Sequence, residues 1–140
     1  MIEKIDHIGI VVKDLNSALK TYEGVFGLKV VKREQLKTMN VEIAFVQMGE
    51  VLVELLEPKG AGAGMIGDFL EQNGEGFHHM ALRVPDIKQS MERAKKFNMQ
   101  LQTDEPLEGA DESSVVFIEP ECTQNVFTEL VERKREVRQD

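Results

Sequence analysis

The chain has 140 residues, with 17 Lys and Arg against 25 Asp and Glu, and 41% of its residues are hydrophobic. This length and composition predict one soluble globular domain, or two small halves with a shared core. The net charge of −8 argues against nucleic acid as a partner, because such binding needs clustered Lys and Arg. With no apolar run of membrane-spanning length and no apolar signal segment at the start, we expect no membrane contact and a cytoplasmic protein.

The first half of the chain begins with alternating apolar residues, which are typical of a strand. Asp14 follows as a predicted N-cap, and Gly27 is the residue expected to end the helix in a left-handed conformation. The expected elements, in chain order, are a strand over 7–12, a helix over 16–26 and strands over 29–34, 40–48 and 51–57. This half therefore reads as a βαβββ module.

The second half repeats the first. HIGIVVKDLNSAL at 7–19 aligns with HMALRVPDIKQSM at 79–91 at an offset of 72, and VELLE at 53–57 aligns with TELVE at 128–132 at an offset of 75. Such self-similarity indicates a duplicated structural unit. In this half Asp86 is the predicted N-cap, like Asp14, and Asn98 is the residue expected to end the helix, like Gly27. The expected elements are a strand over 79–84, a helix over 88–97 and strands over 101–103, 113–118 and 125–131.

The segments of the chain follow from this repeat. Residues 1–58 form the first module and 77–132 the second. Between them, 59–76 is a glycine-rich linker with a short helix near 65–72, and 133–140 is a charged, solvated tail.

His78 and His79 are adjacent, and neighbouring side chains on a strand point to opposite faces. Only one of them can therefore share a face with His7. His79 is the repeat equivalent of His7, so these two share one face of the sheet. His78 shares a face with Met80 and is the structural histidine of the pair. Arg83 lies on the His79 face and is a candidate contact for a substrate anion.

Two glutamates also occupy matching repeat positions, each within an apolar strand. Glu54 lies in VLVELLE and Glu129 in VFTELVE. A buried carboxylate is costly unless it is paired or binds a cation. Related modules would bring His7, Glu54, His79 and Glu129 to one place. Two imidazoles and two carboxylates suit one divalent ion such as Co, Mn, Ni, Zn or Mg; the alternative is a repeat that holds no metal.

The arrangement resembles the vicinal oxygen chelate superfamily, which includes the glyoxalases and bleomycin-resistance proteins. The resemblance extends over 6–132. It implies an α+β fold in which two tandem βαβββ modules form an eight-stranded, cup-shaped mixed sheet with helices outside. It also implies that His7, Glu54, His79 and Glu129 are the metal ligands.

Within this superfamily the chain is most similar to the methylmalonyl-CoA epimerases. The similar stretches are DHIGIVVKDL, VELLEP, DFLEQNGEGFHHMALRV and DEP. This resemblance implies an isomerase that interconverts the (R) and (S) forms of an acyl-CoA thioester, and a homodimer. It also implies an acid/base role for Glu42 in NVEIAF. The loop at 119–125, EPECTQN, is acidic where those enzymes carry a basic segment, so the acyl group accepted stays open.

The expected chemistry is removal of the α-proton of methylmalonyl-CoA through a metal-stabilised enolate. Glu42 is the base on one side, and Glu129, which is also a ligand, or a water acts on the other. Two alternatives remain. One is a lyase of the glyoxalase I type, favoured by the His/Glu/His/Glu set and the altered 119–125 loop. The other is a metal-free small-molecule-binding member of the superfamily.

Overall fold

The computed structural model describes residues 1–60 and 64–137 of the chain. These residues form two compact units: the first contains Met1–His7 and His79–Glu136, and the second contains Ile8–His78 and Val137. Strands β1 (Lys4–Val11) and β5 (Gly76–Arg83) each pass from one unit into the other. The units therefore divide the chain at other positions than the predicted modules. Parts of the predicted linker and tail, 61–63 and 138–140, lie outside the described residues.

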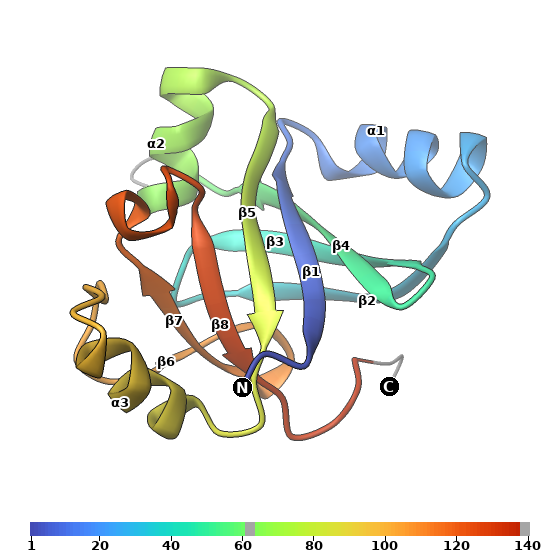
Figure 1. Ribbon diagram of the computed structural model, residues 1–140. Coiled ribbons are helices and arrows are strands. Elements are labelled where there is room, and N and C mark those ends of the chain that lie inside the picture. Colours follow the sequence, from blue (N-terminus) through green and yellow to red (C-terminus); the bar gives the residue numbers. More distant parts are fainter. Residues whose placement is uncertain (61–63, 138–140) are drawn as a thin grey trace. The chain divides into compact units, whose positions relative to one another are not determined.

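The second unit contains an antiparallel meander of three strands (Figure 1). These are β2 (Lys29–Leu36), β3 (Val41–Met48) and β4 (Val51–Pro58), and β4 is followed in the sheet by β1. Gly49 opens the two-residue turn between β3 and β4 with a φ of 62°, a conformation that hairpin turns require. Helix α2 (Gly64–Asn73) matches the short helix predicted in the linker.

The predicted helix over 16–26 is only partly an α-helix. Helix α1 spans Leu15–Leu19 and continues as a π-helix, η1, over Lys20–Val25. The amide of Phe26 donates to the carbonyl of Thr21 at 2.9 Å, which is the i→i+5 spacing of the wider helix. The segment contains Gly24 and β-branched residues, which have low α-helical propensity. Gly27 then ends it with a φ of 67°, as predicted.

In the first unit the strand order is β1-β5-β8-β7-β6. β5 and β8 are parallel and the pairs β7–β8 and β6–β7 are antiparallel. The remaining elements are α3 (Ile87–Lys96), β6 (Leu107–Glu108), η2 (Ala110–Glu112), β7 (Ser114–Ile118), η3 (Pro120–Thr123) and β8 (Thr128–Glu132). The predicted strand over 101–103 is wrong, because Leu101 forms only an isolated bridge to Ile118.

Both predicted N-caps are confirmed. Asp14 accepts a hydrogen bond from the amide of Ser17, and Asp86 accepts one from the amide of Gln89, each at 3.0 Å. Each aspartate thereby satisfies one of the amides that a helix start leaves without an intrahelical partner.

A second cap is duplicated as well, and the sequence did not reveal it. At the end of β4, Glu57 accepts from the amide of Leu15 at 2.7 Å. At the end of β8, Glu132 accepts from the amide of Ile87 at 2.9 Å. In each half, the closing strand is therefore hydrogen bonded to the start of the helix of the same half.

Each unit packs one face of its strands against a helix. In the second unit, the buried cluster consists of Val12, Leu15, Leu19, Ala44, Val46, Val53 and Leu55, with Ile8 and Ile10 against it. In the first unit, it consists of Val84, Ile87, Met91, Val116, Ile118 and Leu130, with Leu82 against it. The expected orientation of the opening strands is confirmed at these positions, so His7 and His79 project from the other face. Among the described residues, eight strands and three α-helical segments confirm the α+β class.

Candidate metal centre

His7 and His79 meet in the first unit. The two Nε2 atoms are 3.2 Å apart and the rings are almost perpendicular, with centroids 5.2 Å apart. Both residues are buried, at 2% and 3% exposed. Two nitrogens that each lie about 2.1 Å from one ion, at tetrahedral or octahedral angles, are roughly 3.0–3.4 Å apart. The separation of the imidazoles therefore fits a shared divalent ion.

Glu129 joins the two histidines from strand β8. Its Oε1 is 3.4 Å from His7 Nε2, and the residue is 6% exposed. The strand register puts Glu129 beside Ala81 on β5 and Phe117 on β7. The ring of Phe117 also packs edge-on against His79, with centroids 5.9 Å apart. Three side chains of ligand type thus converge, with Ala81 and Phe117 as apolar neighbours.

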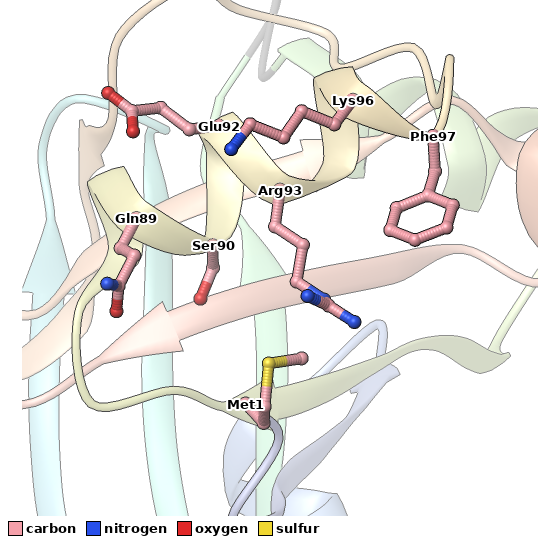
Figure 2. Close-up of a pocket in the computed structure, with 7 residues that line it drawn as sticks. All are labelled: Met1, Gln89, Ser90, Glu92, Arg93, Lys96 and Phe97. Atoms are coloured by element: carbon pink, nitrogen blue, oxygen red, sulfur yellow. The ribbon is translucent and has the colours of Figure 1, made fainter.

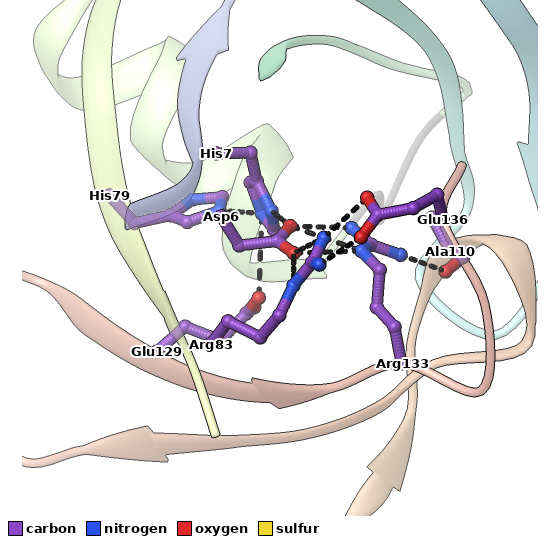
Figure 3. A network of polar contacts seen from close by, with 8 residues as sticks. All are labelled: Asp6, His7, His79, Arg83, Ala110, Glu129, Arg133 and Glu136. Atoms are coloured by element: carbon purple, nitrogen blue, oxygen red, sulfur yellow. Dashed lines mark hydrogen bonds and ion pairs between the residues drawn. The ribbon is translucent and has the colours of Figure 1, made fainter. Parts of the chain in front are cut away.

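Asp6 determines which nitrogen of His7 can bind an ion. Its Oδ1 lies 2.7 Å from His7 Nδ1. Figure 3 draws this contact as a dashed line. An ionised carboxylate only accepts hydrogen bonds, so Nδ1 carries the proton and Nε2 presents its lone pair to His79 and Glu129. Metal-ligating histidines almost always donate their other N–H in this way. The residues present therefore fit a divalent metal, with the Asp6–His7 contact as a supporting interaction.

Two arginines surround Asp6 on its other sides. Arg133 contacts Asp6 Oδ1 through Nη2 at 2.7 Å, and Arg83 contacts Oδ2 through Nε at 2.9 Å. Burial alone would raise the pKa of Asp6, but the hydrogen bonds from His7 and Arg133 outweigh it and hold that pKa far below its usual range. Asp6 is therefore an anion in the folded protein.

The role predicted for Arg83 is not supported by its contacts. Its guanidinium pairs with Asp6 and with both carboxylate oxygens of Glu136. These ion pairs make Arg83 a structural residue that holds Asp6, the partner of His7. They leave it poorly suited to bind a substrate anion. The predicted solvated tail also needs correction at Arg133, whose side chain is only 3% exposed.

Glu54 lies on β4 in the second unit and is 6% exposed. It is paired across the antiparallel ladder with Phe45 on β3. Glu129 is paired in the same way with Phe117 on β7. The two halves thus place a glutamate opposite a phenylalanine at matching repeat positions, which agrees with the duplication predicted from the sequence.

The strand register places Glu42 on the opposite face of the sheet from Glu54. Glu42 is opposite Glu57, whereas Glu54 is opposite Phe45, three residues further along β3. An odd spacing reverses the face. Ala44, which shares the face of Glu42, packs in the cluster around α1. The face of β3 that Glu54 shares carries Val41, Ile43 and Phe45 instead.

The contacts of Glu42 agree with a structural role. It pairs with Arg33 at 2.5 Å and with Lys59 at 3.1 Å, and Lys59 also pairs with Glu57. The hydrogen bonds from Arg33 and Lys59 lower the pKa of Glu42. A general base works best with a pKa near the operating pH, so both the register and these ion pairs argue against the predicted acid/base role of Glu42.

His78 is separate from the His7–His79 pair, as predicted. It is buried in the second unit, where its ring packs edge-on against Phe69 with centroids 4.9 Å apart. Burial lowers the pKa of His78 from 6.5 to about 4. The imidazole is therefore neutral at physiological pH.

This buried imidazole makes stability depend on pH. Between pH 6.5 and 4 the unfolded chain binds a proton at His78 that the folded protein does not bind. We expect this contribution to be complete above pH 6.5 and to be lost as the pH falls toward 4, by up to about 3 kcal/mol. Urea unfolding of wild type and His78→Phe at several pH values measures the difference. Parallel pH profiles for the two proteins would contradict this account.

A pocket of about 400 Å³ lies on helix α3. Figure 2 shows Arg93 pointing from the helix toward Met1, and its guanidinium lies 5.3 Å from the ring centroid of Phe97. The other lining residues are Gln89, Ser90, Glu92 and Lys96. None of the predicted ligands lines this pocket, so it is separate from the candidate metal centre.

The chain matches a known protein superfamily. Residues 6–117 match the Glyoxalase/Bleomycin resistance protein/Dioxygenase superfamily, and the chain belongs to this superfamily. Within residues 1–60 and 64–137, no helix has the length and apolar character needed to cross a membrane.

Individual relatives are similar over nearly the whole chain. The uncharacterised protein YqjC of Bacillus subtilis is 35% identical, over 94% of this chain and 93% of its own. The ethylmalonyl-CoA/methylmalonyl-CoA epimerase of Cereibacter sphaeroides is 32% identical, over 93% and 98%. A variant of Streptomyces coelicolor methylmalonyl-CoA epimerase, in complex with 2-nitronate-propionyl-CoA, superposes with a TM-score of 0.91 at 29% identity, covering both chains fully.

Proposed function

We propose that this protein is a metal-dependent isomerase that interconverts the (R) and (S) forms of methylmalonyl-CoA. The observation that carries the proposal is the convergence of His7, His79 and Glu129, with His7 oriented by Asp6. The epimerases among the relatives support the acyl-CoA substrate. The cytoplasmic location and the homodimer expected from the sequence stay predictions.

The proposed ligands of one divalent ion, Co, Mn, Ni, Zn or Mg, are His7, Glu54, His79 and Glu129. His7, Glu54 and His79 are all buried and all offer a ligand atom. Glu54 is included because it occupies the repeat position of Glu129 and offers a carboxylate oxygen as a ligand atom. When bound, the ion would act as a Lewis acid toward the thioester carbonyl and the carboxylate of the substrate.

Glu129 is the proposed general base. A carboxylate has two oxygens, so one can face the ion while the other accepts the α-proton. Phe117 and Ala81, next to Glu129 on the neighbouring strands, are apolar and buried, so water is kept from this side of the carboxylate. Epimerisation also needs a proton donor on the opposite side of the planar intermediate; Glu54 or a water is the candidate, in place of Glu42.

A specific observation favours lactoylglutathione lyase (glyoxalase I) chemistry as the second candidate. The face of β3 that Glu54 shares carries Val41, Ile43 and Phe45, so β3 offers no additional carboxylate there. A proton shift between neighbouring carbons of an enediolate can be performed by one base on one side. An epimerase returns the proton from the other side and therefore needs a second group.

The test is exchange of the substrate α-proton in deuterated buffer, with the metal content of the purified protein measured in parallel. Methylmalonyl-CoA is compared with the hemithioacetal of methylglyoxal and glutathione. Exchange and racemisation of methylmalonyl-CoA support the epimerase, and turnover of the hemithioacetal alone supports the lyase. If neither substrate reacts and cobalt restores no activity, a metal-free binding protein is the better account.

The Glu42→Gln variant tests the structural role of Glu42. We expect it to keep α-proton exchange within about twofold, since removing a general base would cost about 10²–10⁴-fold. Its expected effect is a small loss of stability from the ion pairs with Arg33 and Lys59, which are partly exposed and therefore weak. Exchange rates and thermal unfolding are measured on the same preparations. A loss of exchange of 10²-fold or more in a folded variant would restore Glu42 as the base.

A further inference from the structure

Asp6 receives more hydrogen bonds than the orientation of one histidine requires. His7 and Arg133 both contact Oδ1 at 2.7 Å, and Arg83 and Arg133 contact Oδ2 at 2.9 Å through their Nε atoms. The side chain of Asp6 is fully buried, and that of Arg133 nearly so. Figure 3 shows the contacts from His7, Arg83 and Arg133 meeting at this carboxylate.

The two arginines come from different parts of the first unit. Arg83 is the last residue of β5, and Arg133 follows the end of β8. Arg133 also donates from Nη1 to the carbonyl of Ala110 at 3.4 Å, and Arg83 pairs with Glu136 beyond β8. Asp6 is thus held by the ends of the strands that carry His79 and Glu129, and by the segment after β8.

This arrangement restricts both the rotation of Asp6 and the tautomer of His7. A carboxylate with one partner can rotate about its terminal torsion, which is a broad and soft degree of freedom. Planar guanidinium groups fix that torsion because they present several donors in one plane. Once Asp6 is fixed, its hydrogen bond with His7 Nδ1 fixes the imidazole plane as well.

We propose that Asp6, clamped by Arg133 and Arg83, is a positioning residue that holds His7 as the Nδ1–H tautomer with Nε2 directed at the candidate metal centre. The tautomer of His7 is a property of the metal-free protein, whereas the effect on metal binding rests on the proposed function. Arg133 and Glu136, which follow β8, thereby support the centre, although neither is a proposed ligand.

The first measurement uses the metal-free protein with ¹⁵N-labelled histidine. Long-range ¹H–¹⁵N spectra, recorded at a pH where the imidazoles are neutral, identify which ring nitrogen of His7 carries the proton. We expect a single Nδ1–H form in the wild type. In Asp6→Asn we expect a mixture or the Nε2–H form, because the amide NH₂ can donate to Nδ1, whereas a carboxylate can only accept.

The second measurement is the affinity for Zn²⁺ and Co²⁺ by calorimetry. We expect Asp6→Asn to weaken it by about 10–100-fold, the usual effect of removing a partner behind a metal-ligating histidine. Arg133→Met should weaken it in the same direction by less, because Arg133 acts on His7 only through Asp6. Arg133→Lys, which keeps the charge and loses the planar fork, should lie between the wild type and Arg133→Met. Arg135→Met is the matched control: Arg135 pairs with Asp111 and Glu112 in the same segment and should leave the tautomer and the affinity unchanged.

The outcomes separate this inference from the proposed function. An unchanged His7 tautomer in a folded Asp6→Asn variant overturns the inference whether or not the protein binds metal. A wild type that binds neither ion removes the proposed metal function, while the tautomer data still decide the role of Asp6. If Asp6→Asn does not fold, the Arg133→Lys and Arg133→Met pair takes its place, and equal spectra and affinities to wild type overturn the clamp.

Discussion

His79→Ala should reduce α-proton exchange by at least about 10³-fold and remove tight binding of the divalent ion. A bound ion stabilises developing charge by several kcal/mol, and each 1.36 kcal/mol corresponds to about a tenfold change in rate. His79 Nε2 lies 3.2 Å from His7 Nε2, so the substitution removes one of the two proposed nitrogen ligands. Exchange by ¹H NMR in deuterated buffer and ion binding by calorimetry measure the two losses.

The neighbouring histidine provides the control. His78→Phe changes the adjacent residue of β5, whose ring packs on Phe69 in the second unit. It should keep both exchange and metal affinity. If His79→Ala keeps the ion, or if both variants lose it equally while folded, His79 is not a ligand.

Glu129→Gln should lower α-proton exchange by about 10²–10⁴-fold, the usual contribution of a general base. The amide keeps the size of the side chain and one oxygen that can bind an ion, but it cannot accept the α-proton. Metal affinity should therefore fall much less than exchange. The contrast between exchange rate and metal affinity distinguishes a base from a residue that only binds the ion. Glu42→Gln is a control with the same isosteric change at a glutamate outside the proposed ligand set.

The control for this variant lies on the same strand. Glu132→Gln weakens the hydrogen bond to the amide of Ile87 at the start of α3. It should cost about 1 kcal/mol of stability or less and leave exchange unchanged. Equal exchange in Glu129→Gln and the wild type would leave the proposed mechanism without its base.

The repeat made the histidine pair predictable. Because His7 and His79 occupy the same position in two copies of one motif, and a strand has a period of two residues, their common face followed from the sequence. The same reasoning selected Glu129 and separated His78 from the pair. These residues depend on local periodicity and on duplication, both of which can be read without coordinates.

The face of β3 on which Glu42 lies was not predictable in the same way. The role of Glu42 was inferred from the resemblance to the epimerases, and a displacement of a single residue along β3 moves a side chain to the other face. The pairing of Glu42 with Glu57, and of Phe45 with Glu54, is a property of the ladder. The pattern of apolar residues in NVEIAFVQM does not define it, because both faces of β3 are largely buried.

The contact between Arg133 and Asp6 was also not predictable from the sequence. ERKREV has the composition of a solvated end, yet Arg133 is buried against Asp6. The interaction joins residues 127 positions apart in the sequence, and no periodicity marks such a pair. A signal did exist at Asp6, which directly precedes the predicted ligand His7, since a carboxylate commonly accepts the second N–H of a metal-binding histidine.

The duplicated glutamate caps have a consequence for how this protein can evolve. Glu57 and Glu132 each lie three residues after a proposed ligand, and each holds the first turn of a helix. A change in the angle of either helix would therefore displace the strand that carries a proposed acidic ligand. Sequence change that alters specificity is easier to accommodate in the connecting loops than in α1 or α3, whose first turns are hydrogen bonded to those strands.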